Sequence, residues 1–182
     1  MISLLILVFI TLYFYLINIY IMIIPLKDID INSLLEFYFK IEPFIPWTEY
    51  GAKGKQAGIQ YKIGDNQWNS AVGKHNDDDL NYSHLNSFFK NSEFENIINE
   101  FNLKRSRLMW LNPYSCYSMH RDQTPRLHIP LITNPDCYFI FKQEPPINLI
   151  AGKIYRAETR LSHTFINCSE MPRLHFIGIL EN

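Results

Sequence analysis

The sequence predicts one α+β domain that is mainly β, because helical and strand-like patterns occupy different parts of the chain. Capping signals and apolar residues at helical spacing occur before residue 105, whereas short runs with alternating apolar residues fill residues 105–182. A chain of 182 residues is long enough for one domain with its own core and too short for two ordinary ones. We therefore expect N-terminal helices packed on a sheet or barrel that the second half of the chain builds.

The first 26 residues form an apolar segment of a different kind. They carry no charged side chain, and residues 4–24 are long and apolar enough to cross a hydrocarbon core of about 30 Å as a helix. No basic residue precedes this run and no small-residue cleavage site follows it, which disfavours a signal peptide. As a transmembrane helix it would leave the domain at residues 27–182 in the cytoplasm, because Lys27 and Lys40 follow it. Equally, Met22 is a candidate true start, and the residues before it are then an upstream leader.

Two Ser-x-x-Glu capping boxes predict two short helices. The first begins at Ser33 and covers residues 33–40, and Pro43 ends it. The second begins at Ser92 and carries an apolar stripe at i, i+3, i+4 and i+7, formed by Phe94, Ile97, Ile98 and Phe101. One face of this second helix should therefore pack on a sheet.

Alternating apolar residues, separated by glycines, prolines and asparagines, predict short strands. Between the two helices, residues 58–63 and 66–72 are typical of a hairpin. Beyond Lys104, strand-like runs cover residues 107–112, 126–132, 137–142, 154–157, 164–167 and 173–180. Helices followed by many antiparallel strands are typical of a double-stranded β-helix, the jelly-roll or cupin-like barrel, with the helices packed on it.

Charge and cysteine content exclude several classes of partner and site. With 17 Lys and Arg against 18 Asp and Glu, the formal net charge is −1, so no bulk positive field holds the protein on nucleic acid or on an anionic membrane surface. The three cysteines are widely spaced and form no Cys-x-x-Cys pair, which argues against a disulfide framework and a zinc knuckle. A reducing compartment such as the cytoplasm fits best, and recognition must come from a local site.

Two histidines and one carboxylate are the strongest candidates for chemistry. His120 and Asp122 lie two residues apart, so in a strand both side chains would share a face and chelate one ion. His163 follows at a separation that suits a return strand of the same barrel. Two imidazoles and one carboxylate, with open coordination positions, suit a non-haem Fe(II) oxygenase.

The phrase Pro-Arg-Leu-His occurs twice in this region, ending once at His128 and once at His175. Arg173 lies ten residues beyond His163. A guanidinium presents a fork of donors that matches a carboxylate, so Arg173 is a candidate anchor for a dicarboxylate co-substrate. Arg126 and His128 share a face, and they either assist this anchor or make a structural ion pair and a core hydrogen bond. His175 is predicted to be structural.

Five phrases in the second half of the chain occur together in one known family. They are Arg-Leu-Met-Trp-Leu-Asn-Pro from Arg107, His-Arg-Asp from His120, Arg-Leu-His-Ile-Pro-Leu from Arg126, His-Thr-Phe-Ile-Asn from His163 and Arg-Leu-His from Arg173. On these phrases, residues 105–179 resemble the aspartyl/asparaginyl β-hydroxylase-like branch of the 2-oxoglutarate and Fe(II)-dependent oxygenases. Animal members of the family lack a carboxylate at the place of Asp122, so this chain is closer to the microbial and phage-like members.

The resemblance implies three iron ligands, which are His120, Asp122 and His163. It also implies that Arg173 anchors the distal carboxylate of 2-oxoglutarate with the help of Arg126 and His128, and that Asn167 shapes the turn after its strand. The implied activity is a 2-oxoglutarate- and Fe(II)-dependent dioxygenase. Such an enzyme uses O2 to hydroxylate a C–H bond of a protein side chain, an amino acid or a small metabolite, and it releases succinate and CO2.

Other interpretations start from the same residues. A cupin-like barrel that binds a metal or ligand without O2 chemistry, a non-catalytic binding module, is the main alternative. Residues 1–24 alone would suit a membrane-tethered interaction protein. His-Arg-Asp also occurs in protein-kinase catalytic loops, but Leu127 stands where the kinase asparagine binds magnesium, and no Gly-rich loop precedes it. His75 beside the acidic residues 77–79 is more typical of a solvated turn than of a second metal site.

Overall fold

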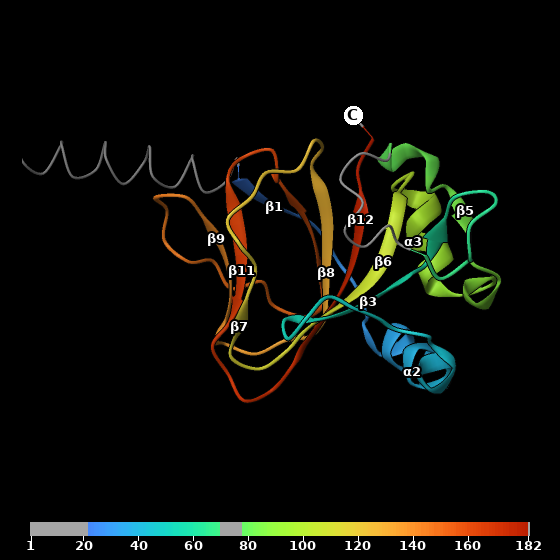
Figure 1. Ribbon diagram of the computed structural model, residues 1–182, viewed down its shortest axis with the longest axis horizontal. Coiled ribbons are helices and arrows are strands. Elements are labelled where there is room, and N and C mark those ends of the chain that lie inside the picture. The colour runs from blue at the N-terminus through green and yellow to red at the C-terminus, as the bar shows by residue number, and fades with distance from the viewer. Residues whose placement is uncertain (1–21, 70–77, 182) are drawn as a thin grey trace, which may run out of the picture.

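The structure is a computed structural model that describes residues 22–69 and 78–181 (Figure 1). Residues 1–21, most of the apolar segment, lie outside the described residues, and so does His75. The transmembrane-helix and leader interpretations therefore stay predictions. The solvated acidic turn is wrong at Asp79, which begins the short helix Asp79–Asn81 and pairs with Arg105 and Arg126. Across the two described ranges, no helix combines the length and the apolar character that a membrane span requires.

Two antiparallel sheets form the body of the domain. The larger has seven strands in the order β1 (Ile23–Asp28), β10 (Lys153–Ala157), β8 (Arg126–Ile132), β12 (Arg173–Ile179), β6 (Lys104–Leu111), β3 (Gly54–Gly58) and β2 (Thr48–Glu49). The smaller has three, in the order β7 (Ser115–Cys116), β11 (His163–Asn167) and β9 (Cys137–Phe141). A separate ribbon pairs β4 (Gln60–Tyr61) with β5 (His84–Leu85).

The large sheet is covered on both faces. Figure 1 shows α2 (Asn32–Ile41) and α3 (Glu93–Glu100) on one side of it and the small sheet on the other. On the helix side, Leu174 and Phe176 of β12 join the buried residues of both helices in one apolar cluster. A second cluster lies between the sheets and includes Leu111, Phe139 and Phe165. Alternate residues of one strand therefore serve different layers, as a period of two requires.

The two predicted helices form, but only one has the predicted cap. At α3, the hydroxyl of Ser92 accepts a hydrogen bond from the Glu95 amide at 3.4 Å, and Phe94, Ile97 and Ile98 are buried. At α2, the capping box is wrong, because Ser33 already lies inside the helix. The N-cap there is Ile31, which has no capping side chain, and the carboxylate of the preceding Asp30 accepts from the Asn32 amide at 2.9 Å. The short helices η1 (Glu42–Phe44), η2 (Asp79–Asn81) and η3 (Ser87–Phe89) complete the helical elements of the described chain.

The predicted C-terminal strands match the structure to within a few residues, and the residues 126–132 coincide with β8. The predicted hairpin between the helices is wrong. The described part of residues 66–72 is a turn, in which the Asn66 side chain accepts from the Trp68 amide at 2.9 Å. Gly58 explains why this turn docks where it does. A Cβ at Gly58 would lie 3.0–3.1 Å from the main-chain oxygens of Asn69 and Trp68.

The segment that carries His120 and Asp122 is not a regular strand, which corrects a further prediction. His120 forms a single antiparallel bridge with His163, and Asp122 lies in the loop that leads into β8. The turn between β11 and β12 is shaped by Asn167, as the resemblance implies. Its side chain donates to the Met171 carbonyl at 2.7 Å and accepts from the Ser169 amide at 3.1 Å.

Candidate metal centre

Main-chain hydrogen bonds bring His120, Asp122 and His163 together. His120 and His163 exchange two bonds, since the amide of each donates to the carbonyl of the other at 2.9 Å. The Asp122 amide donates to the Thr159 carbonyl at 2.9 Å, which ties the loop to the start of β11. The ligand atoms of the three residues then lie within 4.8 Å of one another. Such a group can hold one metal ion.

Both histidines are oriented in the same way. The Nδ1 atom of His120 lies 2.8 Å from the Ser118 carbonyl, and the Nδ1 atom of His163 lies 2.9 Å from the Leu161 carbonyl. A carbonyl only accepts, so Nδ1 is the donor in each ring, and the neutral form of such a ring has its lone pair on Nε2. The Nε2 atom of His163 is buried and has no hydrogen-bond partner among the described residues. An unpaired buried acceptor costs stability, so this atom fits a bound cation.

Charge also suits a metal at these residues. Burial, with a smaller contribution from His120, lowers the pKa of His163, so its imidazole is neutral at neutral pH. Burial opposes ionisation of Asp122, but Arg126, Arg107 and His163 outweigh it and lower the pKa of this carboxyl. Asp122 Oδ2 lies 3.9 Å from the His163 Nε2 atom, so the carboxylate and the imidazole can contact the same ion. Neutral imidazoles and an ionised carboxylate are the states that bind a divalent metal.

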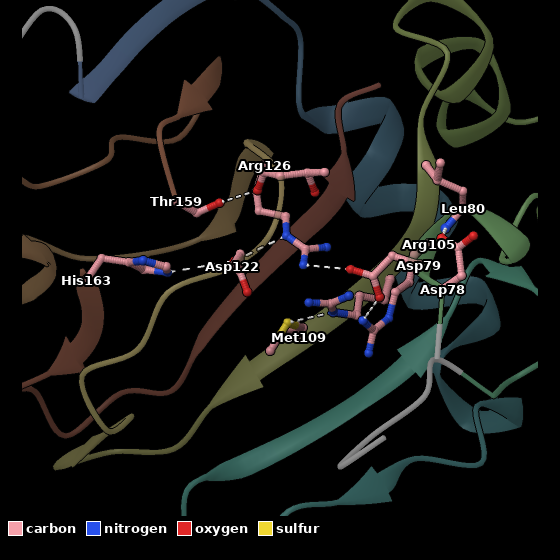
Figure 2. A network of polar contacts seen from close by, with 11 residues as sticks. Asp78, Asp79, Leu80, Arg105, Met109, Asp122, Arg126, Thr159 and His163 are labelled. Atoms are coloured by element: carbon pink, nitrogen blue, oxygen red, sulfur yellow. Dashed lines mark hydrogen bonds and ion pairs between the residues drawn. The ribbon is translucent and has the colours of Figure 1, made fainter. Parts of the chain in front are cut away.

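A chain of ion pairs holds the Asp122 carboxylate in place (Figure 2). Arg126 donates from Nε to Asp122 at 3.2 Å and from Nη2 to Asp79 at 3.0 Å. Arg105 pairs with the other oxygen of Asp79. Arg126 is thus engaged with two carboxylates, one of them a candidate metal ligand.

The triad opens into a small pocket, with a cavity volume of about 50 Å³. Four of the six predicted site residues line it, namely His120, Asp122, Arg126 and His128. Sequence reasoning did not assign the other lining residues to the site; they are Arg107, Met109, Tyr117, Phe165 and Ile177. The signal for two of them was the alternation along β6, which puts Arg107 and Met109 on the face of Leu111 rather than with Leu108.

Arg173 lies in a different place from Arg126. The two Pro-Arg-Leu-His copies are on adjacent antiparallel strands, so Arg126 is opposite Ile179 whereas Arg173 is opposite Leu111. The two guanidiniums therefore lie toward opposite ends of the sheet. Arg173 lines a second, smaller cavity with His175, Thr133, Cys137, Tyr138, Phe139 and Leu149. Its Cζ atom lies 4.9 Å from the centre of the Phe165 ring, and Phe165 also lines the triad pocket.

Polar atoms without hydrogen-bond partners in the described chain line both cavities, those of His128 in the triad pocket and those of Arg173 and His175 in the smaller one. Within the described part of the chain, no hydrogen bond reaches either ring nitrogen of His128 or His175, nor the Nε atom of Arg173. No ion pair there joins Arg173 to a carboxylate, although only 3% of the residue is exposed. Burial lowers its pKa to about 10, so it stays charged at neutral pH. A buried cation without a carboxylate partner in the described chain fits an anionic ligand inside the barrel.

Comparisons with known proteins support the fold and leave the activity open. No protein-family model and no curated protein matches the sequence. Among solved structures, an oxidoreductase of the 2OG-Fe(II) oxygenase family from Burkholderia pseudomallei is similar, with a TM-score of 0.54, 12% identity, and coverage of 87% of this chain and 84% of that one. The DMSP lyase DddQ from Ruegeria pomeroyi has a TM-score of 0.52 and 10% identity, with 87% and 68% covered. The predicted mainly β, jelly-roll or cupin-type barrel is thereby confirmed.

Proposed function

We propose that this protein is a 2-oxoglutarate- and Fe(II)-dependent dioxygenase. It hydroxylates a C–H bond of a protein side chain, an amino acid or a small metabolite and releases succinate and CO2. The observation that carries the proposal is the triad, in which both histidines direct Nδ1 to a main-chain carbonyl and thereby leave Nε2 for a metal ion beside the Asp122 carboxylate. The fold shared with an oxygenase-family structure is consistent with it.

His120, Asp122 and His163 would hold the iron, and the donor set fits Fe(II) because it leaves coordination positions free for a co-substrate and O2. When bound, Fe(II) and 2-oxoglutarate supply the activation of O2 and the attack on the C–H bond. The chain's own tasks are to orient the ligands and to exclude water. The carbonyls of Ser118 and Leu161 fix the imidazoles, and Arg126 fixes the Asp122 carboxylate.

Arg173 would hold the distal carboxylate of 2-oxoglutarate. A buried guanidinium without a carboxylate partner in the described chain supports this role, and its fork of donors matches a carboxylate. His175 lines the same cavity as Arg173, and its ring centre lies 6.0 Å from that of His128. Burial keeps the pKa values of both histidines well below the ordinary value, so each is a neutral ring with one N–H donor. In this proposal Arg126 acts on Asp122 rather than on the co-substrate.

Membership of the aspartyl/asparaginyl β-hydroxylase-like branch is also a proposal. The five sequence phrases support it, and they include the triad residues, Arg126 and Arg173. The two similar structures bear on the fold and not on this branch.

Anaerobic titration with Fe(II) and then 2-oxoglutarate tests the proposed function. We expect a weak visible charge-transfer band that requires both additions and disappears in His163→Ala. Arg173→Met should keep metal binding and lose the band. Failure of the wild-type protein to bind either Fe(II) or 2-oxoglutarate would overturn the proposal.

A non-catalytic binding module remains the second candidate, and one observation favours it. The Phe165 ring lies between Arg173 and the triad pocket, where a co-substrate that joins the two would run. A binding module predicts metal binding without succinate production under air. Substrate-responsive succinate production that is lost in His163→Ala would exclude this candidate.

A further inference from the structure

The apolar N-terminal segment joins the barrel at a fixed point. Met22 and Ile23 are 5% and 6% exposed, and the Met22 carbonyl accepts from the Glu158 amide at 2.8 Å. β1 therefore starts at the end of the barrel where β10 ends and β11 begins (Figure 1). Residues 1–21 carry no charged side chain and join Met22 without a glycine-rich or charged linker. Consecutive Cα atoms lie about 3.8 Å apart, so a surface that binds residues 1–21 must come close to this end.

Main-chain hydrogen bonds gather several segments around Met22. The Lys142 amide donates to the Ser162 carbonyl at 2.8 Å, and the Asp122 amide donates to the Thr159 carbonyl at 2.9 Å. The loop after β10 thus joins the end of β9 to the segment that precedes β8. We call this surface the Met22 face, and it consists of residues 22–24, 119–122, 142–144 and 156–162.

The Met22 face has an excess of basic side chains. Apart from Asp122, which is paired with Arg126, it has four basic side chains and two carboxylates. They are Arg121, Lys142, Arg156 and Arg160, and Glu144 and Glu158. Arg156 and Arg160 pair with Glu158, whereas no ion pair of the described residues joins Arg121 or Lys142 to a carboxylate. The chain as a whole has a net charge of −1, so this positive charge is local.

Exposed apolar side chains lie on the same face. Met119 is 47% exposed and Leu161 is 42% exposed, and neither belongs to the two apolar clusters of the core. Basic and apolar side chains together suit the boundary of a bilayer, where anionic headgroups lie next to hydrocarbon. The uncharged residues 1–21 continue from this face, which favours a lipid surface over a protein or nucleic-acid partner.

We propose that the Met22 face lies on an anionic lipid surface. Arg121 and Lys142 contact the headgroups, and Met119 and Leu161 reach the boundary with the acyl chains. A membrane span alone would attach the domain in any orientation and to any lipid. The proposed contact requires one orientation and anionic lipid, and it does not depend on the reaction at the triad.

Fluorescence quenching in the full chain measures contact with lipid. Met119→Trp adds a tryptophan to the Met22 face, with Leu161→Trp as a second reporter. The control Phe39→Trp adds one to α2, on the other side of the large sheet, where Phe39 is 55% exposed (Figure 1). Each chain is mixed with vesicles of phosphatidylcholine and phosphatidylserine that carry bromine on their acyl chains, and the wild-type signal is subtracted. We expect quenching of the tryptophan added at either face position and none of the one added in the control.

Charge variants in the Met119→Trp chain test the requirement for anionic lipid. Docking is the quenched fraction of the added signal at one lipid concentration. Arg121→Gln with Lys142→Gln should weaken docking about fivefold for each charge removed, and high salt should weaken it as well. Arg121→Lys with Lys142→Arg keeps both charges and should dock normally. Lys53→Gln with Lys90→Gln is the matched control, because it removes the same charge from two exposed lysines outside the face.

Four outcomes would each overturn the proposal. They are a chain that binds neither kind of vesicle, equal quenching of the face and control tryptophans, equal quenching in phosphatidylcholine alone, and equal losses in the charge variant and its matched control. A chain that binds vesicles while both face tryptophans stay fluorescent would confine the membrane contact to residues 1–21, and it would overturn the proposal too. Circular dichroism checks that each variant folds.

Discussion

At the scale of single residues, burial makes the interior histidines electrically neutral. His128 and His175 are each 1% exposed, and burial together with the charge of Arg173 holds their pKa values well below the ordinary 6.5. The unfolded chain therefore takes up protons near pH 6.5 that the folded protein does not. Stability is full above that pH and falls as the pH decreases through and below it.

This predicts an acid-side loss of stability of about 1.4 kcal/mol per pH unit for each buried histidine. Urea unfolding between pH 8 and pH 5 measures the slope. His175→Phe should reduce it by one histidine's share, because the variant removes one proton site. His84→Gln is the matched control, since His84 is exposed, and it should keep the wild-type slope. Equal slopes for His175→Phe and wild type would contradict the prediction.

At the scale of elements, the ion pairs in Figure 2 join η2 and β6 to the loop that carries Asp122. Asp79 of η2 contacts Arg126 and Arg105, so it shares the positive charge that would otherwise fall on Asp122 alone. Without Asp79, the positive charge of Arg126 would be neutralised by Asp122 alone, and this carboxylate would attract a metal ion less strongly. The position of a short 3-10 helix thus influences a metal site on another element.

Asp79→Asn should weaken metal binding about tenfold, the size of effect expected for a residue that orients a ligand. Calorimetric titration with Mn(II) measures it, with folding checked by circular dichroism. The neighbouring variant Asp78→Asn is the control. Asp78 accepts from the Leu80 amide at 3.0 Å, a bond that asparagine can keep, and it pairs with neither arginine. Equal losses in both variants would show that η2 matters only for local folding.

A second prediction at this scale concerns the pairing of β3 with β6. A Cβ at Gly54 would lie 2.1 Å from the main-chain oxygen of Trp110, and that oxygen also accepts from the Tyr50 hydroxyl at 2.6 Å. Neither atom can move without breaking the pair of strands. Gly54→Ala should therefore lower the free energy of unfolding by about 3 kcal/mol, measured by urea unfolding. Lys55→Ala, one residue along β3, serves as the control and should cost less than about 1 kcal/mol.

The local sequence pattern predicted individual helices and strands better than it predicted which segments they pack against. Alternation found β8, and helical spacing found α3, because both signals lie within a few consecutive residues. The turn at residues 66–69 was missed because it packs against Gly58 at the end of β3. A local sequence pattern does not connect these two segments. The repeated phrase suggested that both arginines serve one ligand. Only the antiparallel register shows that Arg126 and Arg173 lie toward opposite ends.

The candidate triad was within reach of sequence because a short motif and one distant histidine identify its residues. What orients those residues was not. The Nδ1 atoms of His120 and His163 contact main-chain carbonyls. Every residue type has such a carbonyl, so the sequence does not indicate which one makes the contact. Arg107 was likewise not assigned to the site, because the alternation along β6 gives its face of the strand but not whether that face is solvated or lines a pocket.

At the scale of the whole molecule, the two faces of the large sheet have different roles, one in stability and one in the candidate site. Its outer face packs against α2 and α3 in the larger apolar cluster, and its inner face carries the buried arginines and histidines. The N-terminal strand belongs to this arrangement. Met22 and Ile23 are 5% and 6% exposed in the inner cluster, and β1 pairs with β10 from Ile23 to Asp28. The predicted boundary between residues 26 and 27 thus falls inside β1.

A chain that begins at Met22 should therefore fold and bind metal as the full chain does. One that begins at Lys27 should lose on the order of 4 kcal/mol, because it lacks the buried side chains of Met22 and Ile23 and half of β1. Urea unfolding and Mn(II) titration of the two shortened chains measure these effects. Equal stability of both would show that β1 contributes little.

Comparing the full chain with the Met22 chain in cells then decides what residues 1–21 do. A membrane anchor predicts that the full chain sediments with membranes and that the Met22 chain is released. An upstream leader predicts that both occur in the same soluble fraction, because the residues before Met22 then have no task in the working protein. Metal affinity should be equal in the two chains in either case, since the triad lies between His120 and His163 and main-chain groups of Ser118, Thr159 and Leu161 orient it.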